Sequence, residues 1–285
     1  MGLANLNDVL IDISKKKKAV GAFNAHILDM IPTLVELAEQ TKSPFIIQIT
    51  EETLRFSGLK HVLNVARRAI EEVDTPIVLH YDHGKNIDRI KECIDAGFTS
   101  VMYDGSKLSF YENVKNTIEV VQYAHQYGVT VEAELGHVGM ANKLIESEAG
   151  VLTIPEEAKE FVEHTSIDAL AVAIGTAHGI YKGPVQLDID RLMAIRKQVS
   201  IPLVLHGGSG VNEAELTKAI DAGISKVNIA SELKAPWAFG LKEFIQSSPH
   251  EIDPRKILKP ALEKYEHAVY EKLCLLKLID HEKKV

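Results

Sequence analysis

Histidines and carboxylates stand at the ends of several apolar segments of this sequence. The apolar segment 75–79 runs into residues 80–84 (H-Y-D-H-G), where a carboxylate lies between two imidazoles. Such groups are costly to bury unless they bind a partner. Three histidines on different segments, His83, His178 and His206, could supply the imidazole nitrogens that suit zinc, and a catalytic zinc site leaves a fourth position open. A metal held in this way polarises a carbonyl and stabilises an enediolate.

Carboxylates near these histidines add proton transfer and further ligands. Asp82 could move protons to and from a substrate. Because consecutive strand residues face opposite ways, Asp82 and His83 reach the same substrate only if the chain turns there, and Gly84 permits a turn. Glu134 or Asp104 could serve as an alternate or outer ligand of the metal.

Glycine-rich segments supply backbone N–H groups for an anion. Residues 175–183 (G-T-A-H-G-I-Y-K-G) and 206–210 (H-G-G-S-G) follow apolar segments, and 228–231 (N-I-A-S) precedes a helical pattern. Glycines allow close approach to phosphate, and a helix N-terminus favours negative charge. A phosphate site beside a carbonyl-polarising metal fits a phosphorylated ketone that is converted to an enediolate.

A lysine Schiff base is the competing route to such a carbanion. It requires a lysine at the C-terminal end of an inner strand. The segment 168–173 has none there, and Lys226 stands at the wrong end of the segment 225–229. The metal route is therefore favoured.

The segments that position these residues alternate between two patterns. Short apolar runs typical of buried strands lie at 19–23, 45–49, 76–81, 99–103, 129–134, 168–173, 201–205 and 225–229. Helical periodicity lies between them at 28–41, 59–73, 86–96, 109–127, 155–165, 188–199 and 212–222. This alternation indicates βαβ units and a parallel sheet. Eight strands in about 250 residues predict an α/β fold, the closed (β/α)8 TIM barrel, with its active site at the C-terminal strand ends.

Two sequence matches share one offset. Residues 76–80 (P-I-V-L-H) recur as 202–206 (P-L-V-L-H), and 94–97 (I-D-A-G) recur as 220–223. The matches favour a barrel that carries a trace of two four-strand halves. His80, the counterpart of His206 in this repeat, receives no role.

The C-terminal part has helical patterns but no strand partner. Residues 231–247 and 256–279 are predicted to be helical, so that 250–285 form a helical extension of the barrel. No linker or low-complexity segment divides the chain. We therefore predict one domain over residues 1–285.

Composition narrows the function classes. The net charge of −8 argues against general nucleic-acid binding, which needs a basic surface. Cys93 and Cys274 have no C-x-x-C spacing, which favours buried thiols in a reducing compartment. No apolar run is long enough to span a bilayer, and the polar N-terminus is no signal peptide. We expect a soluble cytoplasmic protein without nucleic-acid or membrane partners.

The combined motifs resemble those of the class II, zinc-dependent ketose-bisphosphate aldolases. The matching segments are 80–84 (H-Y-D-H-G), 102–106 (M-Y-D-G-S), 131–136 (V-E-A-E-L-G), 171–183, 203–210, 226–234 and 253–256 (D-P-R-K). The resemblance implies a homo-oligomer, a homodimer or homotetramer, that reversibly cleaves a ketose 1,6-bisphosphate. Its products would be dihydroxyacetone phosphate and glyceraldehyde 3-phosphate. Residues 230–234 (A-S-E-L-K) are closer to the tagatose-bisphosphate branch than to the fructose-bisphosphate enzymes.

The resemblance also implies roles for individual residues. His83, His178 and His206 are implied as zinc ligands, with Glu134 and Asp104 as alternate ligands. Asp82 is implied as the acid–base at the C4 hydroxyl, and Asn228 also belongs to the catalytic group. The cradle for dihydroxyacetone phosphate, helped by a monovalent cation (Na⁺ or K⁺), would comprise Gly179, Lys182, Gly207, Gly208, Ser209, Asn228, Ile229, Ala230 and Ser231. Arg255 resembles the arginine that reaches the second phosphate in a neighbouring subunit.

Two segments depart from the family pattern. Residues 139–142 (G-M-A-N) stand where the family has a Gly-Gly pair and then the glutamate that takes the C3 proton. Asn142 cannot act as a base, so Glu146, or else Glu148, is the candidate that swings in. Residues 50–52 (T-E-E) replace small residues at the aldehyde half of the substrate.

Three functions stay open at this point. The first is a zinc-dependent aldolase acting on a ketose bisphosphate, with tagatose favoured and fructose possible. The second is a related class II aldolase acting on a phosphorylated deoxy-keto-gluconate. The third is a non-catalytic, phosphate-binding subunit of an aldolase complex, which Asn142 motivates and which Asp82 and the three histidines oppose.

Overall fold

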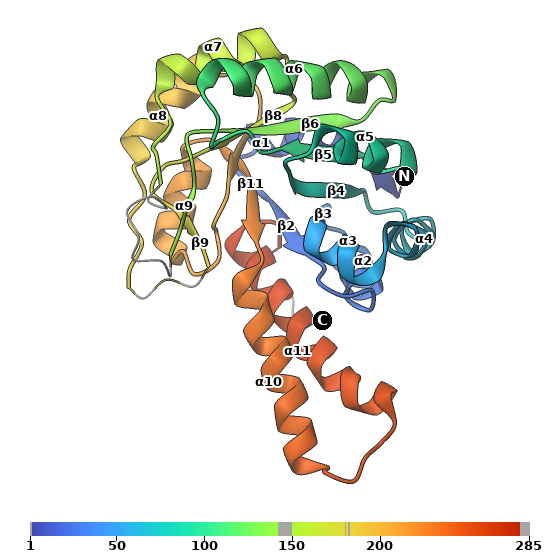
Figure 1. The fold of residues 1–285 in the computed structure, drawn as a ribbon. Helices are drawn as coiled ribbons and strands as arrows, with labels where there is room; N and C mark the ends of the chain where they lie inside the picture. The colour runs from blue at the N-terminus through green and yellow to red at the C-terminus, as the bar shows by residue number, and fades with distance from the viewer. Residues whose placement is uncertain (1, 142–149, 180, 182, 280–285) are drawn as a thin grey trace.

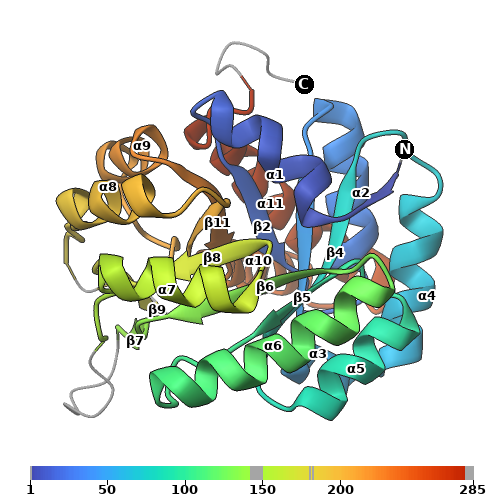
Figure 2. The same ribbon diagram turned by 90° about the horizontal axis from the view of Figure 1, so that it is seen from above.

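Eight parallel strands close into a barrel in the computed structural model of the chain (Figures 1 and 2). The structure describes residues 2–141, 150–179, 181 and 183–279. In barrel order the strands are β2 (Val20–Asn24), β3 (Phe45–Thr50), β4 (Ile77–Gly84), β5 (Ser100–Tyr103), β6 (Thr130–Leu135), β8 (Ala169–Val172), β10 (Leu203–Leu205) and β11 (Ile224–Ile229). Pairing of β11 with β2 closes the barrel. The predicted (β/α)8 barrel is confirmed.

Helices between the strands cover the outside of the barrel. They are α2 (Met30–Thr41), α3 (Glu51–Ser57), α4 (Leu59–Ile70), α5 (Ile87–Ala96), α6 (Phe110–Gln126), α7 (Pro155–Thr165), α8 (Ile189–Gln198) and α9 (Glu213–Asp221). Local sequence sets where they begin: Ser109 and Glu112 form a capping box at α6, and Asn212 accepts a backbone N–H at α9. Helix α3 begins at Glu51, within the segment that departs from the family pattern.

The N-terminal end of the barrel is filled and apolar. Strand β1 (Leu3–Ala4) pairs with the start of β4, and helix α1 (Leu6–Lys15) follows it. Leu6 and Leu10 of α1 are fully buried against inward-facing side chains of the strands, namely Val20, Ala22, Ile46, Val78, Ala169, Ala171 and Val204. A substrate therefore has to enter from the opposite end, where the strands have their C-termini.

Two further helices follow the last strand. Helix α10 (Ser231–Ser247) starts directly after β11, and α11 (Pro254–Leu275) packs along it in a hairpin that extends away from the barrel (Figure 1). Tyr265, Val269 and Leu273 of α11 are buried in the main core and tie the end of the chain to the barrel. The additional C-terminal helices are thus confirmed. None of the described helices is long and apolar enough to cross a membrane.

Candidate active site

The three predicted metal histidines meet at the C-terminal end of the barrel. His83 lies in β4, His178 lies in the two-residue strand β9 (Ala177–His178), and His206 follows β10. Their possible ligand nitrogens all lie within 4.8 Å of one another. The ring centroid of His83 is 4.7 Å from that of His206 and 4.9 Å from that of His178. The sequence therefore named three side chains that the fold brings together.

A turn at His83 lets Asp82 and His83 face the same space. His83 has a φ of 53°, and the register between β4 and β5 shifts between Tyr81 and Gly84. We expected the turn at Gly84, but the left-handed residue is His83. Gly84 is needed for another reason, because a Cβ there would lie 2.8 Å from the Met102 carbonyl oxygen.

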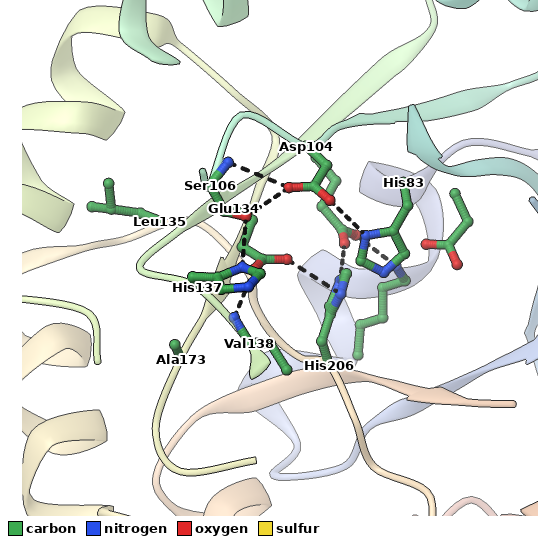
Figure 3. Close-up of polar contacts among 12 residues, drawn as sticks. His83, Asp104, Ser106, Glu134, Leu135, His137, Val138, Ala173 and His206 are labelled. Atoms are coloured by element: carbon green, nitrogen blue, oxygen red, sulfur yellow. Dashed lines mark hydrogen bonds and ion pairs between the residues drawn. The ribbon is translucent and has the colours of Figure 1, made fainter. Parts of the chain in front are cut away.

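Carboxylates fix the protonation of two of the imidazoles. His206 Nε2 lies 2.8 Å from Glu132 Oε1. His83 Nδ1 lies 3.1 Å from Asp104 Oδ2 (Figure 3). A carboxylate only accepts hydrogen bonds, so each of these nitrogens donates, and the other nitrogen of each ring is left to face the cluster. That free nitrogen in His206, Nδ1, is buried and has no hydrogen-bond partner among the described residues. The two carboxylates thus fix which nitrogen of His83 and of His206 is left for a metal.

His178 is held in the neutral form. Burial and the charges of His83 and His206 lower the pKa of His178 to about 3. Its ring therefore carries a free lone pair at neutral pH.

A second group of possible ligands shares His83. Asp104 and Glu134 have oxygens within 4.8 Å of the His83 ring. Glu134 Oε2 is buried without a hydrogen-bond partner in the described part of the chain and lies 3.6 Å from His206 Nδ1. Burial and the nearby Asp104 raise the pKa of the Glu134 carboxyl.

The electrostatics of the cluster favour a cation. Burial alone would lower the pKa of His83, but the negative charges of Asp82, Asp104 and Glu134 raise it to about 9. The same surplus of negative charge attracts a divalent ion. His206 Nδ1 and Glu134 Oε2 also have no hydrogen-bond partner among the described residues. The nitrogen and carboxylate ligands of the cluster therefore fit a metal of the zinc type.

Asp82 is a buried acid beside this cluster. The residue is 4% exposed, and its Oδ1 has no hydrogen-bond partner among the described residues. Burial would raise the pKa of its carboxyl, but the charges of His83 and His206 outweigh this effect and lower it. Asp82 is therefore an ionised carboxylate with a free oxygen at neutral pH.

A charged layer lies below the histidines, inside the barrel. Lys226 donates to Glu132 Oε2 at 2.6 Å, and both side chains are fully buried. His80 is also fully buried, and its Nδ1 lies 2.8 Å from Ser100 Oγ. Sequence reasoning gave no role to Glu132 or to His80. The alternation of β6 was the available signal, because Glu132 and Glu134 share the inward face.

A cavity of about 730 Å³ opens beside the cluster. Asp82, His83 and His178 form one side of it. Six of the predicted cradle residues also line it, namely Gly179, Gly207, Ser209, Asn228, Ala230 and Ser231. Both polar atoms of the Asn228 side chain are buried without partners in the described structure, so they are free for a ligand.

The other cradle residues lie elsewhere. The Gly208 N–H donates to the Asn228 carbonyl oxygen at 3.0 Å, and Ile229 is buried in the hydrophobic core. Neither lines the cavity. Lys182 lies outside the described residues.

The loops around the cavity are tied to each other. Tyr181 donates from its hydroxyl to the Gly207 carbonyl oxygen at 2.9 Å and accepts from the Ala177 N–H at 2.7 Å. Ser209 Oγ accepts from the Ala230 N–H at 3.1 Å, where α10 begins. Strand β9 also pairs with β7 (Gly139–Met140) in a small separate sheet. His178 thus depends on neighbouring loops for its position.

A second cavity, of about 1030 Å³, adjoins the first and shares Thr50, Glu52, Asp82, His83 and His178 with it. Thr50 and Glu52 belong to the segment that departs from the family pattern. Glu51, the third residue of that segment, accepts from Arg89 Nε at 3.0 Å and from the Tyr81 hydroxyl at 3.1 Å. The second cavity is therefore bordered by an acidic segment.

Besides Lys182, two predicted site residues lie either away from the cluster or outside the described residues. Arg255 lies at the start of α11 with an 89% exposed side chain that pairs with Asp253, and it lines a different cavity. Glu146 lies outside the described residues, as do Asn142 and Glu148.

The fold and the site define a barrel enzyme of the aldolase class, and comparisons with known proteins agree. A family model described as "Fructose-bisphosphate aldolase class-II" matches residues 4–281. Over 276 residues, covering 96% of each sequence, the chain is 38% identical to a fructose-bisphosphate aldolase from Geobacillus stearothermophilus. The chain belongs to the class II fructose-bisphosphate aldolase family.

Solved structures support the same assignment. The YdjI aldolase from Escherichia coli K12 matches with a TM-score of 0.85 at 31% identity, covering 99% of this chain and 100% of that one. A fructose-bisphosphate aldolase from Campylobacter jejuni has a TM-score of 0.83 and covers 98% of this chain and 97% of its own. At 23% identity it supports the fold alone. The chain is therefore a carbon–carbon lyase, as the motifs predicted.

Proposed function

We propose that this chain is a zinc-dependent aldolase that cleaves tagatose 1,6-bisphosphate, with fructose 1,6-bisphosphate as the alternative substrate. The products are dihydroxyacetone phosphate and glyceraldehyde 3-phosphate. One observation carries the proposal: His83, His178 and His206 converge beside the buried carboxylate of Asp82, whose Oδ1 has no hydrogen-bond partner among the described residues. A metal and a base would thus share one cavity with an anion cradle.

His83, His178 and His206 would hold the zinc, with Glu134 and Asp104 as alternate ligands. When bound, zinc supplies polarisation of the ketone carbonyl and stabilisation of the enediolate. Glu132 and Asp104 keep the ring protons of His206 and His83 on the sides that face away from the metal position.

Asp82 would move the proton of the C4 hydroxyl. Its free Oδ1 and lowered pKa suit a base that accepts this proton during cleavage and returns it during synthesis. The C3 proton belongs to the reverse, aldol direction, in which we propose Glu146 as the acceptor because Asn142 cannot serve.

The first phosphate would lie in the cradle. Gly179, Gly207, Ser209, Ala230 and Ser231 line the cavity there and offer backbone and hydroxyl groups at the start of α10. Lys182, the backbone of Gly208 and Ile229, and a monovalent cation complete the cradle in this proposal. The free amide of Asn228 would bind the reacting end of the ketone.

Arg255 would act in a neighbouring subunit. It lies on the C-terminal hairpin, away from its own site, and its side chain is exposed. We therefore propose a homodimer or homotetramer in which this arginine binds the second phosphate of the neighbour. Each subunit would be one domain over residues 1–285, with 250–285 as its helical extension.

The substrate is tested by turnover of the purified chain with zinc. Tagatose and fructose 1,6-bisphosphates and a phosphorylated deoxy-keto-gluconate are compared by kcat/KM. Because residues 230–234 match the tagatose branch, the tagatose compound should give the highest value. A higher value for the gluconate would replace the proposal with the related aldolase, and no turnover by the chain alone would indicate a non-catalytic subunit.

Asp82→Asn tests the role of Asp82 as the base in the same assay. It keeps the shape of the side chain but removes the base, so kcat should fall by about 10²–10⁴-fold. Asp95→Asn, on the outer helix α5, is the matched control and should leave kcat unchanged.

A further inference from the structure

A buried ion pair lies directly beneath His206. Lys226 Nζ binds Glu132 Oε2 at 2.6 Å, and the other carboxylate oxygen, Oε1, lies 2.8 Å from His206 Nε2. All three side chains are fully buried. They come from β6, from β11 and from the end of β10, so the contact crosses the interior of the barrel.

The contact decides which nitrogen of His206 faces the cluster. Glu132 accepts the Nε2 proton, which leaves the lone pair on Nδ1. Nδ1 is the buried atom that has no partner among the described residues. Lys226 occupies the second oxygen of Glu132, so the carboxylate is bound at both ends and its plane is fixed.

The other two histidines are held differently. His83 contacts Asp104, which is itself a candidate ligand. His178 has no side-chain hydrogen bond within the described part of the chain and depends on its backbone pairing in β9. His206 is thus the one of the three whose ring is fixed from beneath by residues outside both cavities.

We propose that Glu132 and Lys226 are positioning residues that orient His206 for the metal. The proposal rests on the proposed metal-dependent function. Neither side chain lines either of the two cavities at the cluster, so we place neither in contact with substrate, and both act through the His206 ring. Carboxylate partners of ligating histidines in other metal sites fix the ring in this way.

A purely structural role is the alternative. A buried ion pair can be replaced by apolar side chains of similar volume without loss of stability, whereas removal of one partner leaves a buried charge. Variants that remove both charges therefore separate positioning from folding.

Zinc affinity of the metal-free protein, measured by competition with a coloured chelator, is the readout. Glu132→Met/Lys226→Met removes both charges and the acceptor for His206. Glu132→Gln/Lys226→Met removes the charges but keeps an acceptor oxygen. Glu215→Met/Lys218→Met is the matched control, because this pair, at 2.7 Å, lies on α9 and Glu215 is 8% exposed.

The positioning role predicts that Glu132→Met/Lys226→Met binds zinc about 10–100-fold more weakly than the unchanged protein. The Gln-containing variant should recover most of that loss, and the control should stay within about twofold. Equal affinities for the two variants at residues 132 and 226, or an unchanged affinity for the first, would overturn the proposal.

Two further results of the zinc-binding measurement also bear on the proposal. If the unchanged protein binds no zinc, the proposed function fails, and the inference fails with it. If Glu132→Met/Lys226→Met does not fold, Glu132→Asp replaces it, since it keeps both charges and withdraws the acceptor from His206 by one methylene. More than threefold weaker zinc binding by Glu132→Asp then supports the proposal, and a smaller change overturns it.

Discussion

Two ion pairs near the histidine cluster differ in almost every physical respect. Glu132 and Lys226 lie below the cluster at 2.6 Å with both side chains fully buried. Glu51 and Arg89 lie at the rim at 3.0 Å, with side chains 27% and 24% exposed. Water compensates the charges of the second pair when it breaks, but it cannot reach the first. The lower layer should therefore be intolerant of the loss of one partner, while the rim can vary.

Removal of one buried partner tests the lower layer. Lys226→Met leaves the Glu132 carboxylate buried without its cation, which costs about 3–5 kcal/mol of the free energy of unfolding. Urea unfolding of the metal-free protein measures this loss. Arg89→Met at the rim should cost about 1 kcal/mol or less. Similar losses for the two variants would remove the distinction between the layers.

The loop contact at Gly207 should give a smaller effect. Gly207 has a φ of +65°, and a Cβ there would lie 2.5 Å from the Ala177 carbonyl oxygen, next to His178. Gly207→Ala should therefore destabilise the protein by about 1–3 kcal/mol through backbone strain.

Gly183→Ala is the control for that variant. It lies in the segment that follows β9 (Ala177–His178), and a Cβ there meets nothing within 4 Å. Its free energy of unfolding should stay within about 0.5 kcal/mol of the unchanged protein. If both glycine variants were equally stable, the close approach of residues 177 and 207 would be disproved.

The rim pair should show the smallest effect, in the pH dependence of stability. Burial opposes ionisation of Glu51, but hydrogen bonds from Arg89 and Tyr81 lower the pKa of its carboxyl below 4.5. The contribution of Glu51 is therefore present above pH 4.5 and is lost as the pH falls through the lower, folded pKa.

Comparison with Glu51→Gln measures this contribution. The variant should lose less stability than the unchanged protein between pH 5 and pH 3, with a difference below about 1 kcal/mol. Parallel pH profiles of the two proteins would show that Glu51 gains nothing from Arg89.

The barrel and the three histidines could be predicted because their signals are local. Each strand is a short apolar run, and each reactive side chain stands at a strand end, where parallel strands bring such residues together. Short elements gave no such signal. Strand β1 has two residues and helix α3 has seven, so in neither does the hydrophobic pattern repeat often enough to be recognised.

Contacts between residues that are distant in sequence explain the features of the site that the sequence did not predict. Glu132 and His206 are 74 positions apart, and no local pattern shows that they touch. The turn in β4 was expected at Gly84, since glycine adopts positive φ most easily, but the tertiary environment holds His83 in that conformation. Such conformations cost energy and persist where the surrounding structure enforces them.

The most direct test of the account is cleavage of the sugar bisphosphate before and after zinc removal, with borohydride present in a parallel sample. The account predicts that a chelator abolishes cleavage, that added zinc restores it, and that borohydride traps no substrate on the chain. Cleavage that persists in chelator, together with a borohydride-trapped lysine such as Lys226, would contradict it.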